Sequence, residues 1–215
     1  MDHTTVSHGA VKSESTAQSE RSTGQVMRKL ATVMTRLPAC LVLACAAYVG
    51  MPTASHAADA LPEPVNVSLP DAKKLGNSKF TWFGLHVYDA QLWSSVTGKQ
   101  FDYKVHPSWL ELKYGRDFAG ADIAEQSREE MEKIGGASEE KLREWEKKLA
   151  EIFPNIKKGD TLSAMYLPGK VMQFFHNGKP LAAVNDMELA RSFMGIWLDA
   201  KTSEPDLRKK LIGLR

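Results

Sequence analysis

The chain has 215 residues, 43% of them hydrophobic and 25% charged, which are ordinary values for one globular domain with an appended segment. Its net charge is +2 at pH 7, so it lacks the basic excess that is typical of nucleic-acid-binding domains. The two cysteines, Cys40 and Cys45, both lie in an apolar N-terminal segment. The rest of the sequence therefore has no disulfide, no thiolate nucleophile and no cysteine metal ligand.

Residues 1–26 are polar without an apolar period, which predicts a disordered N-terminal extension. Residues 27–57 combine basic residues, an apolar run at 37–49 and small residues before a cleavage position after Ala57, which predicts a signal peptide. The apolar run is shorter than the roughly 20 residues of a spanning helix. A membrane anchor, a lipoprotein modified at Cys45, and a translation start at Met27 remain alternatives. We expect a periplasmic or secreted domain of residues 58–215 with no transmembrane segment.

The first half of this domain is predicted to contain mostly strands. Val65–Leu69 alternates as an edge strand, and residues 73–78 are typical of a turn. Phe80–Trp93 is rich in aromatic and β-branched residues on both faces, which predicts a central strand, with Gly84 marking a close approach. Residues 101–105 are expected to pair back, and Trp109–Tyr114 is the next strand, apolar on one face and polar on the other.

The second half alternates helices and strands. Apolar residues recur at helical spacing across Ala121–Ile134, which Gly135-Gly136 ends, and again from the N-cap Ser138 to Ile152. Strands are predicted at Thr161–Leu167, Val171–His176 and Leu181–Val184, with a type I′ turn at Asn177-Gly178. Helices follow Asp186 and Ser203. The order predicts a single α+β domain whose largely antiparallel sheet has its helices on one side.

The sequence contains no self-sufficient catalytic motif. His86, His106 and His176 are not at metal-ligand spacing, and no Gly-x-Ser-x-Gly elbow is present, so we expect no metal and no cofactor. Four of the five tryptophans fall on predicted core positions. Two cations at strand ends, Lys79 and Arg116, are candidate binders of a carboxylate or enolate. The alternative for Arg116 is an ion pair with Asp117 or Asp122.

Several segments resemble the chalcone isomerase-like family, in order and spacing, from Pro64 to Leu214. They are Phe80–Trp93, Leu110–Phe118, Gly159–Leu162, Phe174–Gly178, Phe193–Asp199, Thr202–Pro205 and Leu207–Arg208. The resemblance implies an open-faced β-sandwich, in which a large antiparallel sheet packs against a helical layer with a cleft between them. It also implies a site. In the plant members that the chain resembles, an arginine and a tyrosine help to close a chalcone to a flavanone. In non-catalytic members, the resemblance implies that the same two residues hold the carboxylate of a fatty acid.

This chain departs from both family patterns. The arginine's place falls at or beside Lys79, and the tyrosine's place falls near Ile123, while Tyr88 and Tyr114 are possible substitutes. We therefore expect an exported, non-catalytic domain of a bacterial secreted branch that binds a small apolar or amphipathic ligand such as a fatty acid. Candidate ligand-binding residues are Lys79, Arg116, Tyr88 and Tyr114. The alternatives are an isomerase or intramolecular lyase that uses Arg116 and a tyrosine, and a partner protein of the cell envelope.

Overall fold

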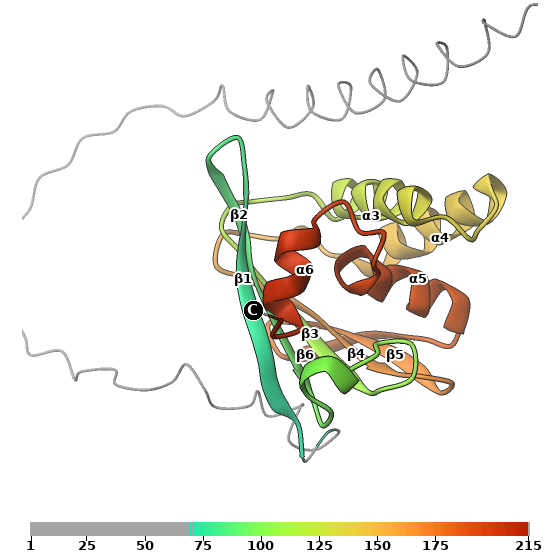
Figure 1. Cartoon of the computed structure of the whole chain (residues 1–215). Helices are drawn as coiled ribbons and strands as arrows, with labels where there is room; N and C mark the ends of the chain where they lie inside the picture. The colour runs from blue at the N-terminus through green and yellow to red at the C-terminus, as the bar shows by residue number, and fades with distance from the viewer. Residues whose placement is uncertain (1–68, 70, 215) are drawn as a thin grey trace, which may run out of the picture. The chain divides into compact units, whose positions relative to one another are not determined.

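The computed structural model describes residue 69 and residues 71–214 (Figure 1). The predicted N-terminal extension, the signal peptide and all but the last residue of the strand at Val65–Leu69 lie outside these residues. Six strands form one antiparallel sheet in which each strand pairs with the next in sequence. The strands are β1 (Lys73–Trp82), β2 (Leu85–Ser94), β3 (Ser108–Tyr114), β4 (Thr161–Leu167), β5 (Val171–His176) and β6 (Lys179–Val184).

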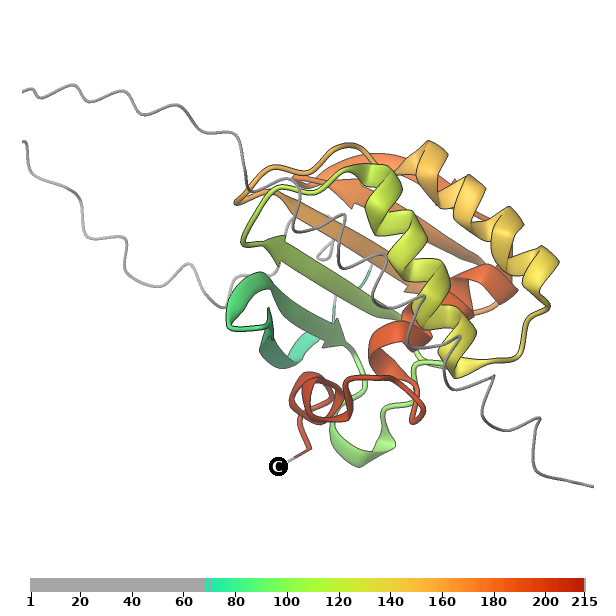
Figure 2. The same cartoon turned by 90° about the horizontal axis from the view of Figure 1, so that it is seen from above.

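Four helices pack on one face of this sheet (Figures 1 and 2). They are α3 (Gly120–Ile134), α4 (Glu139–Ile152), α5 (Met187–Leu198) and α6 (Pro205–Leu211), and a single 3-10 turn, η2 (Gly98–Gln100), follows β2. Ser138 caps α4 by accepting from the Lys141 N–H, and Asp186 caps α5 by accepting from two backbone N–H groups. The predicted α+β fold, an antiparallel sheet against a helical layer, is confirmed. None of the helices in this part of the chain is long and apolar enough to cross a membrane.

The prediction of one central strand over Phe80–Trp93 is wrong. The segment is most of a hairpin, in which β1 is an edge strand and the chain reverses at Phe83 (φ 46°) and Gly84 (φ 76°). Residues 73–78 belong to β1 and are not a turn. The pattern misled because phenylalanine rarely adopts positive φ, so the turn carries no sequence signal at its first position.

Two further local predictions are corrected. Gly84 does not mark a close approach, because no atom of the described residues lies within 4 Å of the position its Cβ would occupy. The close approach is at Gly76, where a Cβ would lie 2.0 Å from the Lys210 carbonyl oxygen of α6. Residues 101–105 form a loop and no strand. Its Tyr103 is buried and donates a hydrogen bond of 2.8 Å to Asp199 Oδ2.

The face of the sheet away from the helices carries a smaller apolar cluster. Trp109 is fully buried in this cluster, its ring centroid 4.7 Å from that of Phe175, and Leu69 and Ala72 lie in the same cluster. Four of the five tryptophans are buried, as predicted, and Trp82 is the exposed one. The helical layer therefore covers one face, and side chains of the sheet itself and of the segment before β1 form the cluster on the other.

Candidate functional site

An aromatic row runs across the helix-facing side of the sheet at the hairpin end. It consists of Phe80 on β1, Tyr88 on β2, Tyr114 at the end of β3 and Phe118 in the loop before α3. Successive ring centroids are 5.1, 6.0 and 5.4 Å apart. Register places the three strand residues together, because Phe80 pairs with Tyr88 and Tyr88 pairs with Tyr114. Tyr114 is buried, whereas the other three are only half-buried, so the row is an apolar surface that the helices do not fully cover.

The two tyrosine hydroxyls of the row are neutral hydrogen-bonding groups. Burial raises the pKa of Tyr88, the hydrogen bond from Trp197 lowers it, and the charges of Glu204 and Glu130 raise it, with a net upward shift. The Trp197 indole N–H donates to the Tyr88 hydroxyl oxygen at 3.1 Å. Burial likewise raises the pKa of Tyr114. Both hydroxyls therefore keep their protons at neutral pH, so they can donate hydrogen bonds to a ligand but cannot serve as bases.

Arg116 lies at one end of the aromatic row. Its guanidinium carbon is 5.8 Å from the centroid of the Phe118 ring, a cation–π distance. Among the described residues, no carboxylate lies within ion-pair distance of it. The expected alternative partner Asp117 instead binds Lys157 Nζ at 2.9 Å and accepts from the Lys158 N–H at 2.8 Å. The guanidinium is half-buried, and its N–H groups can donate hydrogen bonds to an anion.

The position of Arg116 is set by the glycine before it. The Gly115 N–H donates to the Val87 carbonyl oxygen at 2.8 Å, which continues the pairing between β2 and the end of β3. A Cβ on Gly115 would lie 2.4 Å from Nδ1 of His86, so the imidazole packs directly on the glycine. The chain therefore leaves the sheet at Arg116, where the β1–β2 hairpin begins to extend past the end of β3.

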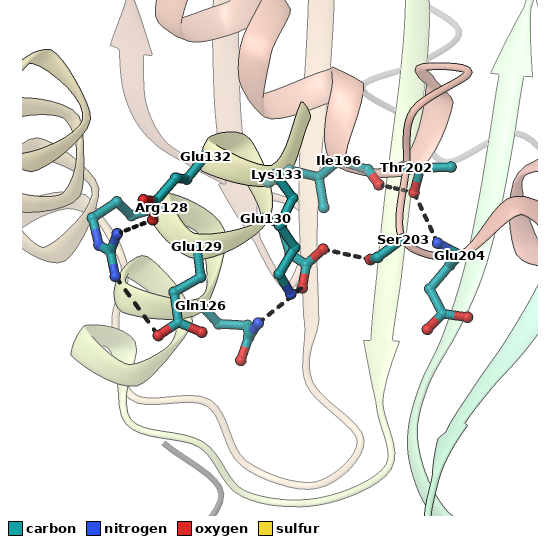
Figure 3. A network of polar contacts seen from close by, with 10 residues as sticks. All are labelled: Gln126, Arg128, Glu129, Glu130, Glu132, Lys133, Ile196, Thr202, Ser203 and Glu204. Carbon is teal, nitrogen blue, oxygen red and sulfur yellow. Dashed lines mark hydrogen bonds and ion pairs between the residues drawn. The ribbon is translucent and has the colours of Figure 1, made fainter. Parts of the chain in front are cut away.

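Near Tyr88, an acidic network ties α3 to the segment between α5 and α6 (Figure 3). Ser203 donates to Glu130, which also accepts from Lys133 Nζ at 2.8 Å and from Gln126 Nε2 at 3.1 Å. Burial raises the pKa of the neighbouring Glu204, and the negative charge of Glu130 adds to that shift. Negative charge thus gathers on the Trp197 side of Tyr88.

Sequence reasoning missed this network. The apolar spacing predicts a helix at Ala121–Ile134 and another after Ser203, but neither pattern predicts a contact between the two segments. The two segments are far apart in sequence, and only the packing of α3 beside α5 brings them together. No local motif carries that information.

The sequence profile of the chalcone isomerase-like family matches residues 66–213. The chain belongs to that family. No curated protein matches the chain. Among solved structures, a fatty-acid binding protein from Arabidopsis thaliana is similar, with 14% sequence identity and a TM-score of 0.51. The similarity covers 66% of this chain and 87% of the plant protein. At that identity, it shows the chalcone isomerase-like fold.

The structure brings three of the four candidate residues of this chalcone isomerase-like domain together. Tyr88, Tyr114 and Arg116 meet at the aromatic row, whereas Lys79 lies on the opposite face of the sheet. Lys79 pairs with Asp89 in the β1–β2 register, one position away from the Phe80–Tyr88 pair, so its side chain faces away from the helices. It is exposed there.

Ile123 occupies the first turns of α3, near the place of the tyrosine in the family resemblance. It is half-buried, packs against the main core, and offers no hydroxyl. Among the described residues, no group of three or more His, Cys, Asp and Glu side chains is placed to hold a metal ion. A shallow depression of about 520 Å³ lies on α4, lined by the charged residues Glu139, Glu140, Arg143, Glu144 and Lys147. That surface is separate from the aromatic row.

Proposed function

We propose that this protein is an exported, non-catalytic chalcone isomerase-like domain that binds a small amphipathic ligand such as a fatty acid. The observation that carries the proposal is the half-buried aromatic row with the Arg116 guanidinium at its end, which has no ion-pair partner among residues 71–214. An apolar surface with one cation at its edge matches a molecule with a hydrocarbon body and an anionic head. The similar plant protein, by its title a fatty-acid binding protein, supports the same class of ligand.

The charges around the row predict the orientation of the ligand. A carboxylate beside Arg116 gains charge-assisted hydrogen bonds, whereas a carboxylate on the Trp197 side of Tyr88 faces Glu130 and Glu204. The head therefore binds at Arg116, and the chain lies along Phe118 and Tyr88 toward the helical layer. The neutral Tyr88 and Tyr114 hydroxyls are the further donors within the row.

The same residues argue against isomerase chemistry. Catalysis of the family reaction needs donors where negative charge develops on the substrate, and each such donor is typically worth about 3 kcal/mol. Here Ile123 has no hydroxyl, and Lys79 faces away from the helical layer. A chalcone bound in the row would therefore lack a donor at each of the two places where the family resemblance implies the arginine and the tyrosine.

Fatty-acid titration tests the binding proposal. We expect saturable quenching or enhancement of tryptophan fluorescence by laurate, because Trp197 donates to Tyr88 in the row. Arg116→Gln should weaken binding about tenfold or more, a loss of about 1.4 kcal/mol or greater for a charge-assisted contact. Lys79→Gln is the matched control, since it removes a cation from the other face, and it should bind as the parent does.

A second measurement uses the protein as its host makes it. Native mass spectrometry of protein purified from that host should show a co-purified species with the mass of a lipid or fatty acid. No bound species together with no saturable titration would refute the ligand proposal. So would equal affinities in the parent and in Arg116→Gln.

Export is tested separately. The apolar and small-residue pattern of residues 27–57 supports cleavage after Ala57. N-terminal sequencing of the protein from a periplasmic or culture-medium fraction should therefore begin at Ala58. Recovery of the chain in the cytoplasmic fraction with residues 27–57 intact would contradict export.

A further inference from the structure

The tip of the β1–β2 hairpin exposes large apolar side chains. Phe83 is 87% exposed, Leu85 43% and Trp82 37%. The Trp82 and Phe83 rings contact each other edge-to-face with centroids 5.1 Å apart. The hairpin projects past the neighbouring strand, because β3 ends at Tyr114, opposite Tyr88 (Figure 1). These three side chains are called here the hairpin tip; Phe83 gains little burial from the fold, and Trp82 and Leu85 are only partly covered.

The backbone conformation of Phe83 is unfavourable for a phenylalanine. Phe83 has φ 46° and Gly84 has φ 76°, nearly the values of the β5–β6 turn, where Asn177 has φ 50° and Gly178 has φ 75°. Asparagine tolerates this region, and phenylalanine does so only at a cost. In the β5–β6 turn the side chain also forms hydrogen bonds within the fold, with the Thr161 N–H and with Asp160. The exposed Phe83 ring instead contacts the neighbouring Trp82 ring, and forms no other ring contact within the described part of the chain.

Positive charge flanks the hairpin tip. Lys79 and Lys113 are exposed on the open face near the base of the hairpin, and Arg116 lies beside it on the helical side. Within the described residues, none of these three cations forms an ion pair. Asp89 lies between the two lysines in the register and is approached by His86 Nε2 at 3.2 Å. An exposed apolar tip with cations behind it is complementary to an anionic lipid surface.

We propose that the hairpin tip inserts into the interfacial region of an anionic lipid bilayer. Phe83, Trp82 and Leu85 enter the boundary between headgroups and acyl chains, and Lys79 and Lys113 contact the headgroups. A second copy of the chain is a poorer occupant, because three side chains at a narrow tip fall far short of the roughly 800 Å² per partner in a stable interface. This proposal does not depend on the ligand in the aromatic row.

Depth-dependent quenching tests the proposal at one residue. The other four tryptophans are buried in the fold, so brominated lipids quench Trp82 selectively. The protein, as its host processes it, is mixed with brominated phosphatidylcholine vesicles with and without phosphatidylglycerol. We expect quenching that is stronger with the anionic lipid, that falls as salt is added, and that is lost in Trp82→Phe. Absence of quenching in the parent protein overturns the proposal.

Two matched variants separate insertion from folding. Phe83→Asn installs the Asn-Gly turn of the β5–β6 hairpin, so it should fold at least as well as the parent while vesicle affinity falls about tenfold or more. Val105→Asn removes an exposed apolar side chain, 62% exposed, from the loop at the opposite end of the sheet, and should leave vesicle affinity unchanged. Parent-like vesicle binding by Phe83→Asn overturns the proposal. So does a dimer in sedimentation that Phe83→Asn dissociates without any vesicle binding by the parent.

Discussion

Gly76 lies in β1 where the backbone of α6 crosses it. A Cβ at this position would lie 2.0 Å from the Lys210 carbonyl oxygen and 2.8 Å from that of Leu211. Both obstacles are backbone atoms, so neither can move without shifting the helix. The absence of a side chain at one residue thus allows α6 to pack against the edge strand.

Gly76→Ala should therefore destabilise the fold strongly. Because the whole of α6 would have to move, we expect a loss of about 3 kcal/mol or more in the free energy of unfolding. Gly195→Ala in α5 is the control: its Cβ would meet side-chain atoms and no backbone, the nearest being the Tyr103 hydroxyl at 3.2 Å, and alanine gains helix propensity. Urea unfolding of both variants and of the parent measures these changes in the free energy of unfolding. Equal stabilities would show that α6 adjusts without cost.

Asp186 is a charged residue whose contribution to stability should depend on pH. Burial raises its pKa, but hydrogen bonds from the Leu189 N–H, the Trp145 indole and the Glu188 N–H outweigh burial and hold the pKa below its usual range. A carboxyl whose folded-state pKa is depressed stabilises the fold when ionised. That stabilisation is complete above the ordinary pKa of 3.8 and is lost as pH falls through the lower folded-state value.

Asp186→Ala should cost about 2 kcal/mol near pH 7, because it removes a helix cap and leaves a buried indole N–H without an acceptor. The difference from the parent should shrink below about pH 3.8. Ser138→Ala, which removes the neutral cap of α4, should cost about 1 kcal/mol at either pH. Thermal unfolding from pH 2 to pH 7 measures both. A pH-independent penalty for Asp186→Ala would exclude the charged cap.

Two of the hairpins, β1–β2 and β5–β6, are informative to compare. Both turn through two residues with positive φ, one with Phe-Gly at its tip and the other with Asn-Gly. Two side-chain hydrogen bonds stabilise the β5–β6 turn: Asn177 accepts from the Thr161 N–H at 2.8 Å and donates to Asp160 Oδ1 at 2.9 Å. In the β1–β2 turn, the Phe83 side chain contacts the Trp82 ring.

Exchanging the turn residues should change stability in opposite directions. Phe83→Asn relieves a positive-φ penalty and should stabilise the fold by about 1 kcal/mol. Asn177→Phe adds that penalty and breaks two hydrogen bonds, so it should cost about 2 kcal/mol or more. Differential scanning calorimetry reports both changes. A destabilised Phe83→Asn would mean that the exposed ring supports the fold.

At the scale of the whole molecule, the sheet has two apolar clusters of unequal size. The larger one lies between sheet and helices, and the smaller one on the open face depends on Leu69 and Ala72, which precede β1. Those two residues are buried beside Trp93 and Trp109. The boundary of the stable domain is therefore set by residues before the first strand.

Two truncations test this boundary. A chain that starts at Ala58 should unfold with the stability of the full chain, since it keeps both clusters. A chain that starts at Lys73 should lose roughly 2–4 kcal/mol, because two buried side chains are removed and the tryptophans beneath them meet water. Its fluorescence should also shift to longer wavelength. Equal stability of the two truncations would show that the open face needs no cover.

The sequence by itself determined the elements whose signals are local. Helical spacing with Ser138 and Asp186 as caps predicted α4 and α5, and Asn177-Gly178 predicted the β5–β6 turn, because caps and turn residues act within a few positions of the chain. It also identified Tyr88, Tyr114 and Arg116 as candidates.

Only the tertiary structure decided how those candidates are arranged. A shift of one residue in register moves a side chain to the other face of a sheet, so no local pattern could predict that Tyr88 faces the helices while Lys79 faces away. The turn at Phe83 and the meeting of Glu130 with Ser203 likewise depend on contacts between distant segments. Local chemistry specifies the elements, whereas register and packing specify which side chains share a surface.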